Sequence, residues 1–189
     1  SEVMELNYSR IQFTPDLMPA DILGTNMIVE DEDGRRGFEF QRGPVFTQIL
    51  LADEINRATP KTQSAMLETM QEGTVTAGGT RFVLDKPFFV LATQNPIEQE
   101  GTYPLPEAQL DRFLMHVRVS YPDAGAEQAI LRLARSEAGG THSRPEGTVS
   151  QADIFSARKA VLDIHMAPAV EEYIIQLIVG TREPDHYDS

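Results

Sequence analysis

The sequence predicts an α/β domain built on a parallel sheet, followed by an all-helical part. Residues 49–52 and residues 88–92 are continuously apolar, which suits strands buried on both faces of such a sheet. A helical pattern lies between these two runs, and the sequence after residue 122 is helical in pattern. We therefore expect one domain over residues 1–122 and a second, helical domain over residues 123–189.

Shorter strands complete the predicted α/β part. Residues 10–13 alternate in the manner of a strand, and residues 115–119 form a further strand candidate. Residues 26–47 are typical of a β-ribbon that turns in the acidic stretch 31–34. Residues 74–84 predict a second hairpin, with its turn at two consecutive glycines.

The helices are predicted from capping residues and apolar spacing. They are expected between these residues: Pro60 to Gly73, a short helix begun by Pro106 and Glu107, Asp123 to Gly139 and Gly140, a helix after Ser150, and Pro168 to Gly180. In the first of them, Gln63, Met66, Leu67 and Met70 share one stripe. Ser150 with Asp153 forms a capping pattern for the fourth.

The composition argues against several classes of function. Of the 189 residues, 41% are hydrophobic and 24% charged, as in soluble globular proteins. No apolar run approaches the ~18 residues of a membrane span and no signal peptide is visible, so we expect no membrane insertion. The lack of cysteine excludes disulfides and thiolate metal sites, and it fits a cytoplasmic protein. A net charge of −13 disfavours nucleic acid as a partner, although the acidity is also explained by solubility.

Two adjacent carboxylates, Asp53 and Glu54, follow the first apolar run. They would lie at the carboxyl end of a strand, where open α/β sheets bind ligands. Successive strand residues point to opposite sides, so the two acids are expected to have different roles. One can help to hold Mg²⁺ through water, and the other can orient and polarise an attacking water. A strand that ends in two solvated acids gives the same pattern.

Asn95 follows the second apolar run and precedes Pro96. An amide at a strand end can hold a water or a γ-phosphate oxygen without adding charge. Asparagine before proline is also a common turn former, and this alternative stays open.

Arg112 lies between Leu110 and Phe113, which we place on the short helix begun by Pro106. Its guanidinium suits a γ-phosphate, and a neighbouring subunit can supply such a group as an arginine finger. An ordinary surface ion pair is the alternative.

Together these stretches resemble a known family. They are Leu51–Ala58, similar to its Walker B motif, Leu91–Pro96, similar to its sensor 1, and Glu98–Phe113, similar to its arginine-finger segment. The three occur in the order found in the MoxR family of AAA+ ATPases, and the resemblance runs from about residue 10 to residue 182. It implies an AAA+ P-loop NTPase-type parallel sheet with flanking helices, incomplete because its first strand is missing, and then part of an α-helical lid.

The resemblance also implies roles for single residues, with ATP and Mg²⁺ as cofactors. Asp53 would support Mg²⁺, Glu54 would activate water, and Asn95 would help to position that water. Arg112 would act on the ATP of the next subunit, and Arg57 would also reach the subunit interface. The ribbon at 26–47 would be the insertion that marks this clade, and the hairpin at 74–84 its pre-sensor hairpin. In relatives such protrusions face a central pore or a partner.

The family resemblance further implies a homo-oligomeric ring, expected to be a hexamer, that remodels or matures protein clients as a chaperone. A von Willebrand factor A domain protein is one possible client. The alternatives are a magnesium-chelatase-like subunit, a DNA helicase of the same clade, which the negative charge disfavours, and an inactive scaffold that has lost its P-loop.

A Walker A loop, Gly-x-x-x-x-Gly-Lys-Ser/Thr, does not occur in this sequence. Of its three lysines, Lys61 alone precedes Ser or Thr, and it lacks the glycines before it. We therefore expect a fragment of a longer protein, truncated at both ends and inactive by itself. The sensor 2 arginine of the family is not matched, because Arg182 lies too close to the last helix.

Overall fold

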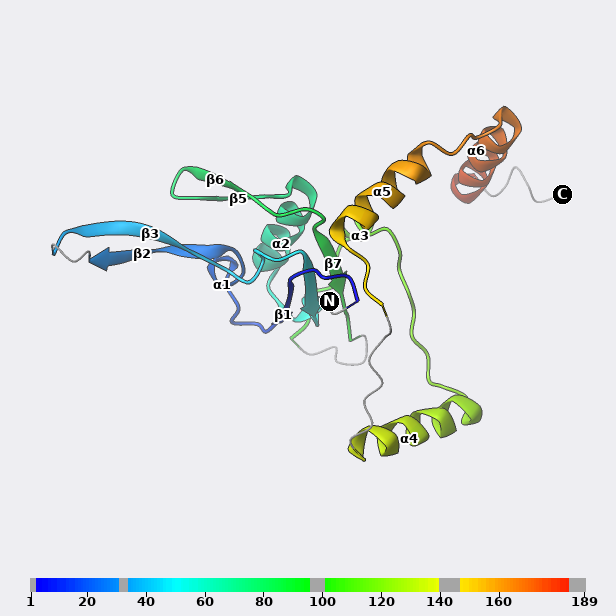
Figure 1. Ribbon diagram of the computed structural model, residues 1–189, viewed down its shortest axis with the longest axis horizontal. Helices are drawn as coiled ribbons and strands as arrows, with labels where there is room; N and C mark the ends of the chain where they lie inside the picture. The colour runs from blue at the N-terminus through cyan, green and yellow to red at the C-terminus, as the bar shows by residue number, and fades with distance from the viewer. Residues whose placement is uncertain (1–2, 31–33, 96–100, 140–146, 184–189) are drawn as a thin grey trace. The chain divides into compact units, whose positions relative to one another are not determined.

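A computed structural model of the protein describes residues 3–30, 34–95, 101–139 and 147–183 (Figure 1). The predicted ribbon turn at residues 31–33, Pro96, the start of the arginine-finger segment at residues 98–100 and Gly140 lie outside the described residues. The described chain divides into two compact units, residues 1–148 and 149–189. The division that we expected after residue 122, from the change in pattern, stays a prediction.

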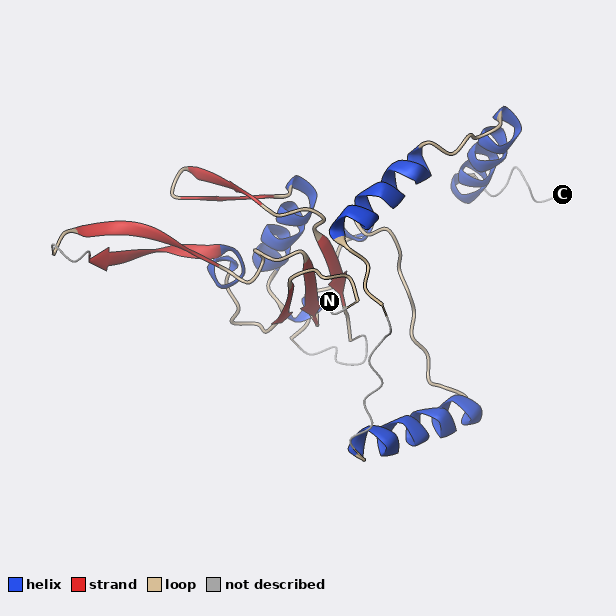
Figure 2. Ribbon diagram, in the orientation of Figure 1, coloured by secondary structure: helices blue, strands red, loops and turns tan. Residues whose placement is uncertain are grey.

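The centre of the first unit is a three-stranded parallel sheet, as predicted (Figure 2). Its strands are β1 (Tyr8–Gln12), β4 (Ile49–Asp53) and β7 (Phe89–Ala92), in the order β1-β4-β7. The register aligns Gln12 with Asp53 and Ala52 with Ala92. All three strands therefore end at the same edge of the sheet.

One long helix covers the core of this unit. Helix α2 (Pro60–Glu72) begins at Pro60 and ends at Gly73, whose φ of 63° provides the left-handed cap that glycine adopts without strain. The predicted stripe is confirmed, since Gln63, Met66 and Leu67 are buried. Around them the core gathers apolar side chains from α1 (Pro19–Leu23), the 3₁₀ turn η1 (Ile55–Arg57), the sheet and other segments of this unit. These are Ile11, Phe13, Ile22, Val45, Leu50, Ala52, Ile55, Ala58, Val75, Leu84 and Leu105.

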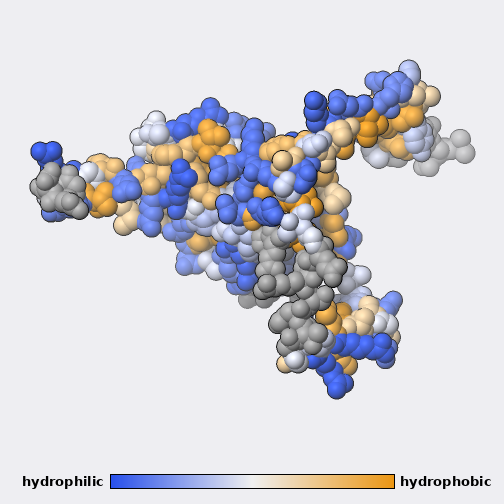
Figure 3. Space-filling view, viewed as in Figure 1, coloured by the Kyte–Doolittle hydropathy of each residue, from blue (hydrophilic) through white to orange (hydrophobic). Residues whose placement is uncertain are grey.

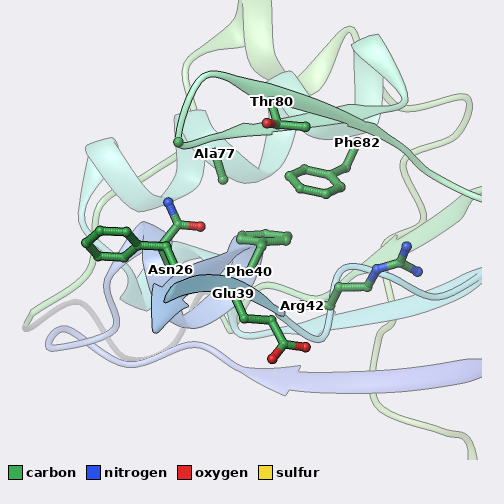
Figure 4. A pocket seen from close by; sticks show the side chains of 9 residues that line it. Asn26, Glu39, Phe40, Arg42, Ala77, Thr80 and Phe82 are labelled. Carbon is green, nitrogen blue, oxygen red and sulfur yellow. The ribbon is translucent and has the colours of Figure 1, made fainter. Parts of the chain in front are cut away.

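Two antiparallel hairpins extend from this core, and both were predicted. Strands β2 (Gly24–Glu30) and β3 (Arg36–Arg42) form the ribbon, and β5 (Thr74–Ala77) and β6 (Thr80–Val83) form the second hairpin. Phe40 of the ribbon stacks on Phe82 of the hairpin, with ring centroids 4.4 Å apart (Figure 4). The two rings contribute to the wall of a groove of about 470 Å³ between the hairpins.

The later helices carry apolar side chains on their surfaces. They are α3 (Glu107–Leu110) and α4 (Ala124–Ala138) in the first unit, and α5 (Gln151–Leu162) and α6 (Pro168–Arg182) in the second. The predicted caps are confirmed: the Asp123 carboxylate accepts from Ala126 N at 2.8 Å, and Ser150 and Asp153 form a capping box. Exposed apolar residues of these helices show as orange surface in Figure 3. No described helix is both long and apolar enough to cross a bilayer.

One predicted strand and one predicted helix end are wrong. Residues 115–119 form no strand; Val119 is 92% exposed, and Leu114 just before them is 91% exposed. A strand needs a partner, and in the described part of the sheet β7 pairs only with β4. The last helix passes Gly180 and ends at Arg182, because glycine inside a helix costs only about 1 kcal/mol.

The position of α2 in the core predicts the effect of truncating Leu67. In the whole protein, Leu67→Ala should lower the free energy of unfolding by about 2–5 kcal/mol, because it removes a fully buried side chain. Glu68→Ala, on the exposed side of the same helix, should change it by less than about 0.5 kcal/mol. Urea denaturation measures both, and equal midpoints for the two variants would contradict this packing.

Candidate functional site

The candidate site lies at the carboxyl edge of the parallel sheet. Asp53 is the last residue of β4, Glu54 follows it, and Asn95 lies three residues beyond the end of β7. The Asn56 side chain links the two strand ends, since its Nδ2 donates to the carbonyl oxygen of Asn95 at 3.2 Å. The structure therefore brings three of the four predicted site residues to one edge.

The Asp53 carboxylate is held by a residue of β1 and by the residue that follows β7. The Thr93 hydroxyl donates to Asp53 Oδ1 at 2.5 Å, and Arg10 Nε donates to Oδ2 at 3.2 Å. The hydrogen bond from Thr93 contributes most to holding the pKa of Asp53 below its ordinary value, and the hydrogen bond from Arg10 contributes next. Asp53 in turn raises the pKa of Arg10. The Asp53 side chain is thus an oriented anion, and it is 22% exposed.

Glu54 marks an abrupt change of backbone direction. Its φ of 55° and ψ of 47° are left-handed, a conformation that costs a non-glycine residue about 1–2 kcal/mol. Its amide nitrogen donates to Thr93 Oγ1 at 2.9 Å, and Ile55 N donates to Thr93 O at 3.0 Å. The Thr93 hydroxyl therefore serves both acids, accepting from the Glu54 backbone and donating to Asp53.

The Glu54 carboxylate also has partners on both sides. Gln12 Nε2 donates to Glu54 Oε2 at 2.8 Å, and Arg57 Nη1 lies 3.3 Å from the same oxygen. Strand alternation was the wrong basis for separating Asp53 from Glu54, because β4 ends at Asp53 and the turn redirects Glu54. Alternate residues of β1 now contact the two acids, Arg10 reaching Asp53 and Gln12 reaching Glu54.

Arg112 comes from a different segment of the chain, after α3. Helix α3 ends at Leu110, so Arg112 is not on the helix as predicted but in the turn after it. The final turns tighten: Arg112 N donates to Gln109 O and Phe113 N to Leu110 O, each three residues back. Its side chain is exposed, and no described hydrogen bond or ion pair joins it to Asp53, Glu54 or Asn95. Leu105 and Phe113, which belong to or pack on the core, fix the segment on either side of it.

The donor set fits Mg²⁺ held partly through water. No group of three or more His, Cys, Asp or Glu within the described residues would hold a metal ion. Asp53 and Glu54 offer carboxylate oxygens and are 22% and 25% exposed, so water can reach both side chains. Each carboxylate oxygen has two lone pairs and can accept from water besides its protein partners. Mg²⁺ keeps several waters and needs few protein ligands, which suits this edge.

Sequence reasoning did not assign roles to Arg10, Gln12 or Thr93. A signal existed for the first two, because parallel strands align their carboxyl ends and residues two apart share a face. Thr93 lies within the stretch that resembles sensor 1. Its contacts with both acids follow from the register of β4 and β7 and not from the residues next to it in the sequence.

Comparison with known proteins adds to this geometry. Residues 1–115 match the family described as "ATPase family associated with various cellular activities (AAA)". "Uncharacterized protein YeaC" of Bacillus subtilis (strain 168) is 44% identical over 177 residues, covering 94% of this chain and 54% of that protein. "Chaperone MoxR1" of Mycobacterium tuberculosis is 44% identical over 178 residues, covering 94% of this chain and 45% of that protein.

A crystal structure of a candidate ATPase from Cytophaga hutchinsonii ATCC 33406 shares the fold. Its TM-score is 0.84 at 45% sequence identity, over 98% of this chain and 55% of that one. This chain thus spans about half the length of the curated relatives it matches.

The parallel sheet and the family match define a domain of the AAA+ ATPase class. Within that class the chain belongs to the MoxR family, in agreement with its similarity to proteins named MoxR1 and MoxR. The resemblance carried by the three sequence stretches is confirmed.

The contacts of Thr93 predict how Asp53 titrates in a variant. Thr93→Val removes the hydrogen bond that contributes most to the low pKa of Asp53, so this pKa should rise towards its ordinary value. A lowered pKa stabilises the fold above the unfolded-state pKa, and this stability is lost as the pH falls through the folded-state pKa. The variant should therefore lose less stability on acidification. Carbon-13 NMR of the Asp53 carboxyl group in the whole protein measures the shift.

Thr69→Val is the matched control, because the Thr69 hydroxyl donates to Ala65 O within α2. It should leave the titration of Asp53 where it is in the parent protein. An unchanged pKa of Asp53 in Thr93→Val would show that Thr93 does not set it.

Proposed function

We propose that the whole protein hydrolyses ATP at the interfaces between subunits of a homo-oligomeric ring, a hexamer, and uses the cycle to remodel or mature protein clients. The observation that supports this most is the meeting of Asp53, Glu54 and Asn95 at one sheet edge, on the positions of the family motifs. A protein with a von Willebrand factor A domain is one class of client that the family resemblance suggests. We propose the cytoplasm as its location.

Each residue has a role that follows from its chemistry. Asp53 accepts hydrogen bonds from water around Mg²⁺ or binds the ion directly, and its low pKa keeps it ionised at neutral pH. Bound with ATP, Mg²⁺ neutralises charge on the phosphate oxygens. Glu54 accepts a proton from, or polarises, the attacking water, and the Asn95 amide orients that water. Gln12 and Arg57 hold Glu54 Oε2, which restricts the carboxylate to one direction.

Arg112 acts on a neighbouring subunit in this proposal. Its exposed side chain suits a group that is presented outward. A guanidinium supplied in this way stabilises charge that develops on the transferred phosphoryl group. Tight ATP binding also needs a phosphate-gripping loop, which this 189-residue sequence lacks, so we propose that the chain alone does not turn over ATP.

Removing the proposed base tests the assignment of Glu54. Glu54→Gln in the whole protein should lower kcat for ATP hydrolysis at least about 100-fold while nucleotide binding persists, because a positioned base contributes about 10²–10⁴-fold. Phosphate release and equilibrium nucleotide binding measure the two effects. Glu68→Gln, an exposed acid of α2, serves as the control. Near-normal turnover by Glu54→Gln would remove Glu54 from the mechanism.

Mixing two inactive variants tests whether Arg112 acts between subunits. Arg112→Ala keeps Glu54, and Glu54→Gln keeps Arg112. A ring assembled from both variants therefore contains some interfaces at which one subunit supplies an intact Glu54 and its neighbour an intact Arg112. We expect mixed rings to recover ATP hydrolysis that neither variant shows alone, since removing an arginine finger costs about 10³-fold or more. The rate of phosphate release at different mixing ratios measures this recovery. Mixed rings as inactive as their components would mean that Arg112 serves its own chain or serves no catalytic purpose.

A further inference from the structure

Two buried amide residues, Gln63 through its side chain and Asn56 through its main chain, join the turn after Glu54 to the segment that leads to Arg112. Gln63, on α2, is 1% exposed, and Asn56, in η1, is 7% exposed. Polar side chains this deeply buried are costly unless their hydrogen bonds are made. The carbonyl groups that the two side-chain nitrogens bond therefore indicate which segments these side chains connect.

Gln63 connects the turn after Glu54 to Tyr103, which lies 40 residues after Gln63 in the sequence. Its Nε2 donates to Ile55 O at 3.2 Å and to Ala58 O at 3.1 Å, at the two ends of the turn after Glu54. The same nitrogen donates to Tyr103 O at 2.8 Å. An amide nitrogen has two hydrogens, so these three carbonyls share them and all depend on one side chain.

Asn56 holds the same two segments from the other side. The main-chain carbonyl oxygen of Asn56 accepts from Tyr103 N at 2.6 Å. Both backbone polar groups of Tyr103 are therefore bonded, its N to Asn56 and its O to Gln63. The Asn56 side chain donates to Asn95 O. One assembly of buried hydrogen bonds thus touches the turn after Glu54, the end of β7 and the start of the segment that carries Arg112.

Among the described residues, the other attachments of the segment from Tyr103 to Arg112 to the core are weak or apolar. Leu105 is buried, and Gln109 Nε2 lies 3.5 Å from Ser64 Oγ, the limiting length of a hydrogen bond. The turn after Glu54, in contrast, is fixed independently by the bonds of Glu54 N and Ile55 N to Thr93. Loss of the Gln63 carboxamide would therefore displace the Arg112 segment more than it displaces Glu54.

We propose that Gln63, through its side chain, and Asn56, through its main-chain carbonyl, are positioning residues that hold the Arg112 segment in register with the turn of Glu54. The acid that a subunit uses on its own ATP and the arginine that it presents to the next subunit are then placed as one unit. This inference rests on the function proposed above, because it assigns the two residues to the positioning of Arg112.

A double-mutant cycle in the whole protein tests the proposal. Gln63→Met keeps the length of the side chain and removes its donors. It should lower kcat about 10- to 100-fold, as small misplacements of a reacting group do, and change KM less than about twofold. In an Arg112→Ala background the same change should lower kcat by less than about twofold, because the group that it positions is already absent. Gln63→Asn, whose carboxamide is one methylene shorter, replaces Gln63→Met in the cycle if that variant does not fold.

Thr69→Val is the matched control, since it removes a buried hydroxyl from the same helix but no bond to Tyr103. It should leave kcat within about twofold in both backgrounds. If Gln63→Met lowers kcat by the same factor with and without Arg112, Gln63 acts through general stability and the proposal is overturned.

Amide hydrogen exchange separates the failure of this proposal from the failure of the proposed function. In Gln63→Met, peptides covering residues 101–110 should exchange at least about tenfold faster than in the parent protein, whereas Thr69→Val should leave them unchanged. If Arg112→Ala alone leaves kcat unaltered, the proposed role of Arg112 fails, and exchange still decides whether Gln63 holds the segment. Unchanged exchange in Gln63→Met would overturn the positioning role whatever the kinetics show.

Discussion

The parallel pairing of β1, β4 and β7 is the constraint on which the site depends. Parallel strands end at a common edge, so residues from three separate parts of the sequence meet there without any of them being near neighbours in the chain. An antiparallel order would place Glu54 and Asn95 at opposite edges. The core under α2 serves this arrangement, because burial of Leu50 and Ala52 in β4 fixes the strand that carries the acids.

Charge at that edge is balanced by the neighbouring strand. Two adjacent carboxylates repel each other, and Arg10 and Gln12 supply a cation and an amide to them. The left-handed turn at Glu54 costs free energy, but the bonds of Thr93 to both acids over-determine it. Backbone strain and satisfied hydrogen bonds at one position are typical of a site whose geometry serves chemistry more than stability.

Much of the fold and part of the site could be predicted from the sequence. Apolar runs with polar ends predicted β4 and β7, and caps predicted α2, α4 and α5, because these signals are local. The partners of Asp53 and Glu54 depend on strand register, which is set by how separate strands pair and not by the residues next to the acids. Residues 115–119 failed as a strand for a related reason: their composition suits a sheet, but strand formation depends on a neighbour to pair with.

Gln63 shows that the apolar stripe of a helix can include a residue whose role is hydrogen bonding, which the stripe pattern does not predict. It shares the stripe of Met66 and Leu67, and burial alone would class all three as packing residues. Its amide instead donates to carbonyls of the tight turn after Glu54 and to Tyr103 O, which lie in irregular backbone outside the long helices and the sheet. A leucine at this position would fill the same space but remove the donor from these carbonyls, and a buried carbonyl left without any donor costs about 1–3 kcal/mol. The polar residue in the apolar stripe therefore follows from the irregular backbone that surrounds the turn after Glu54 and the Tyr103 segment.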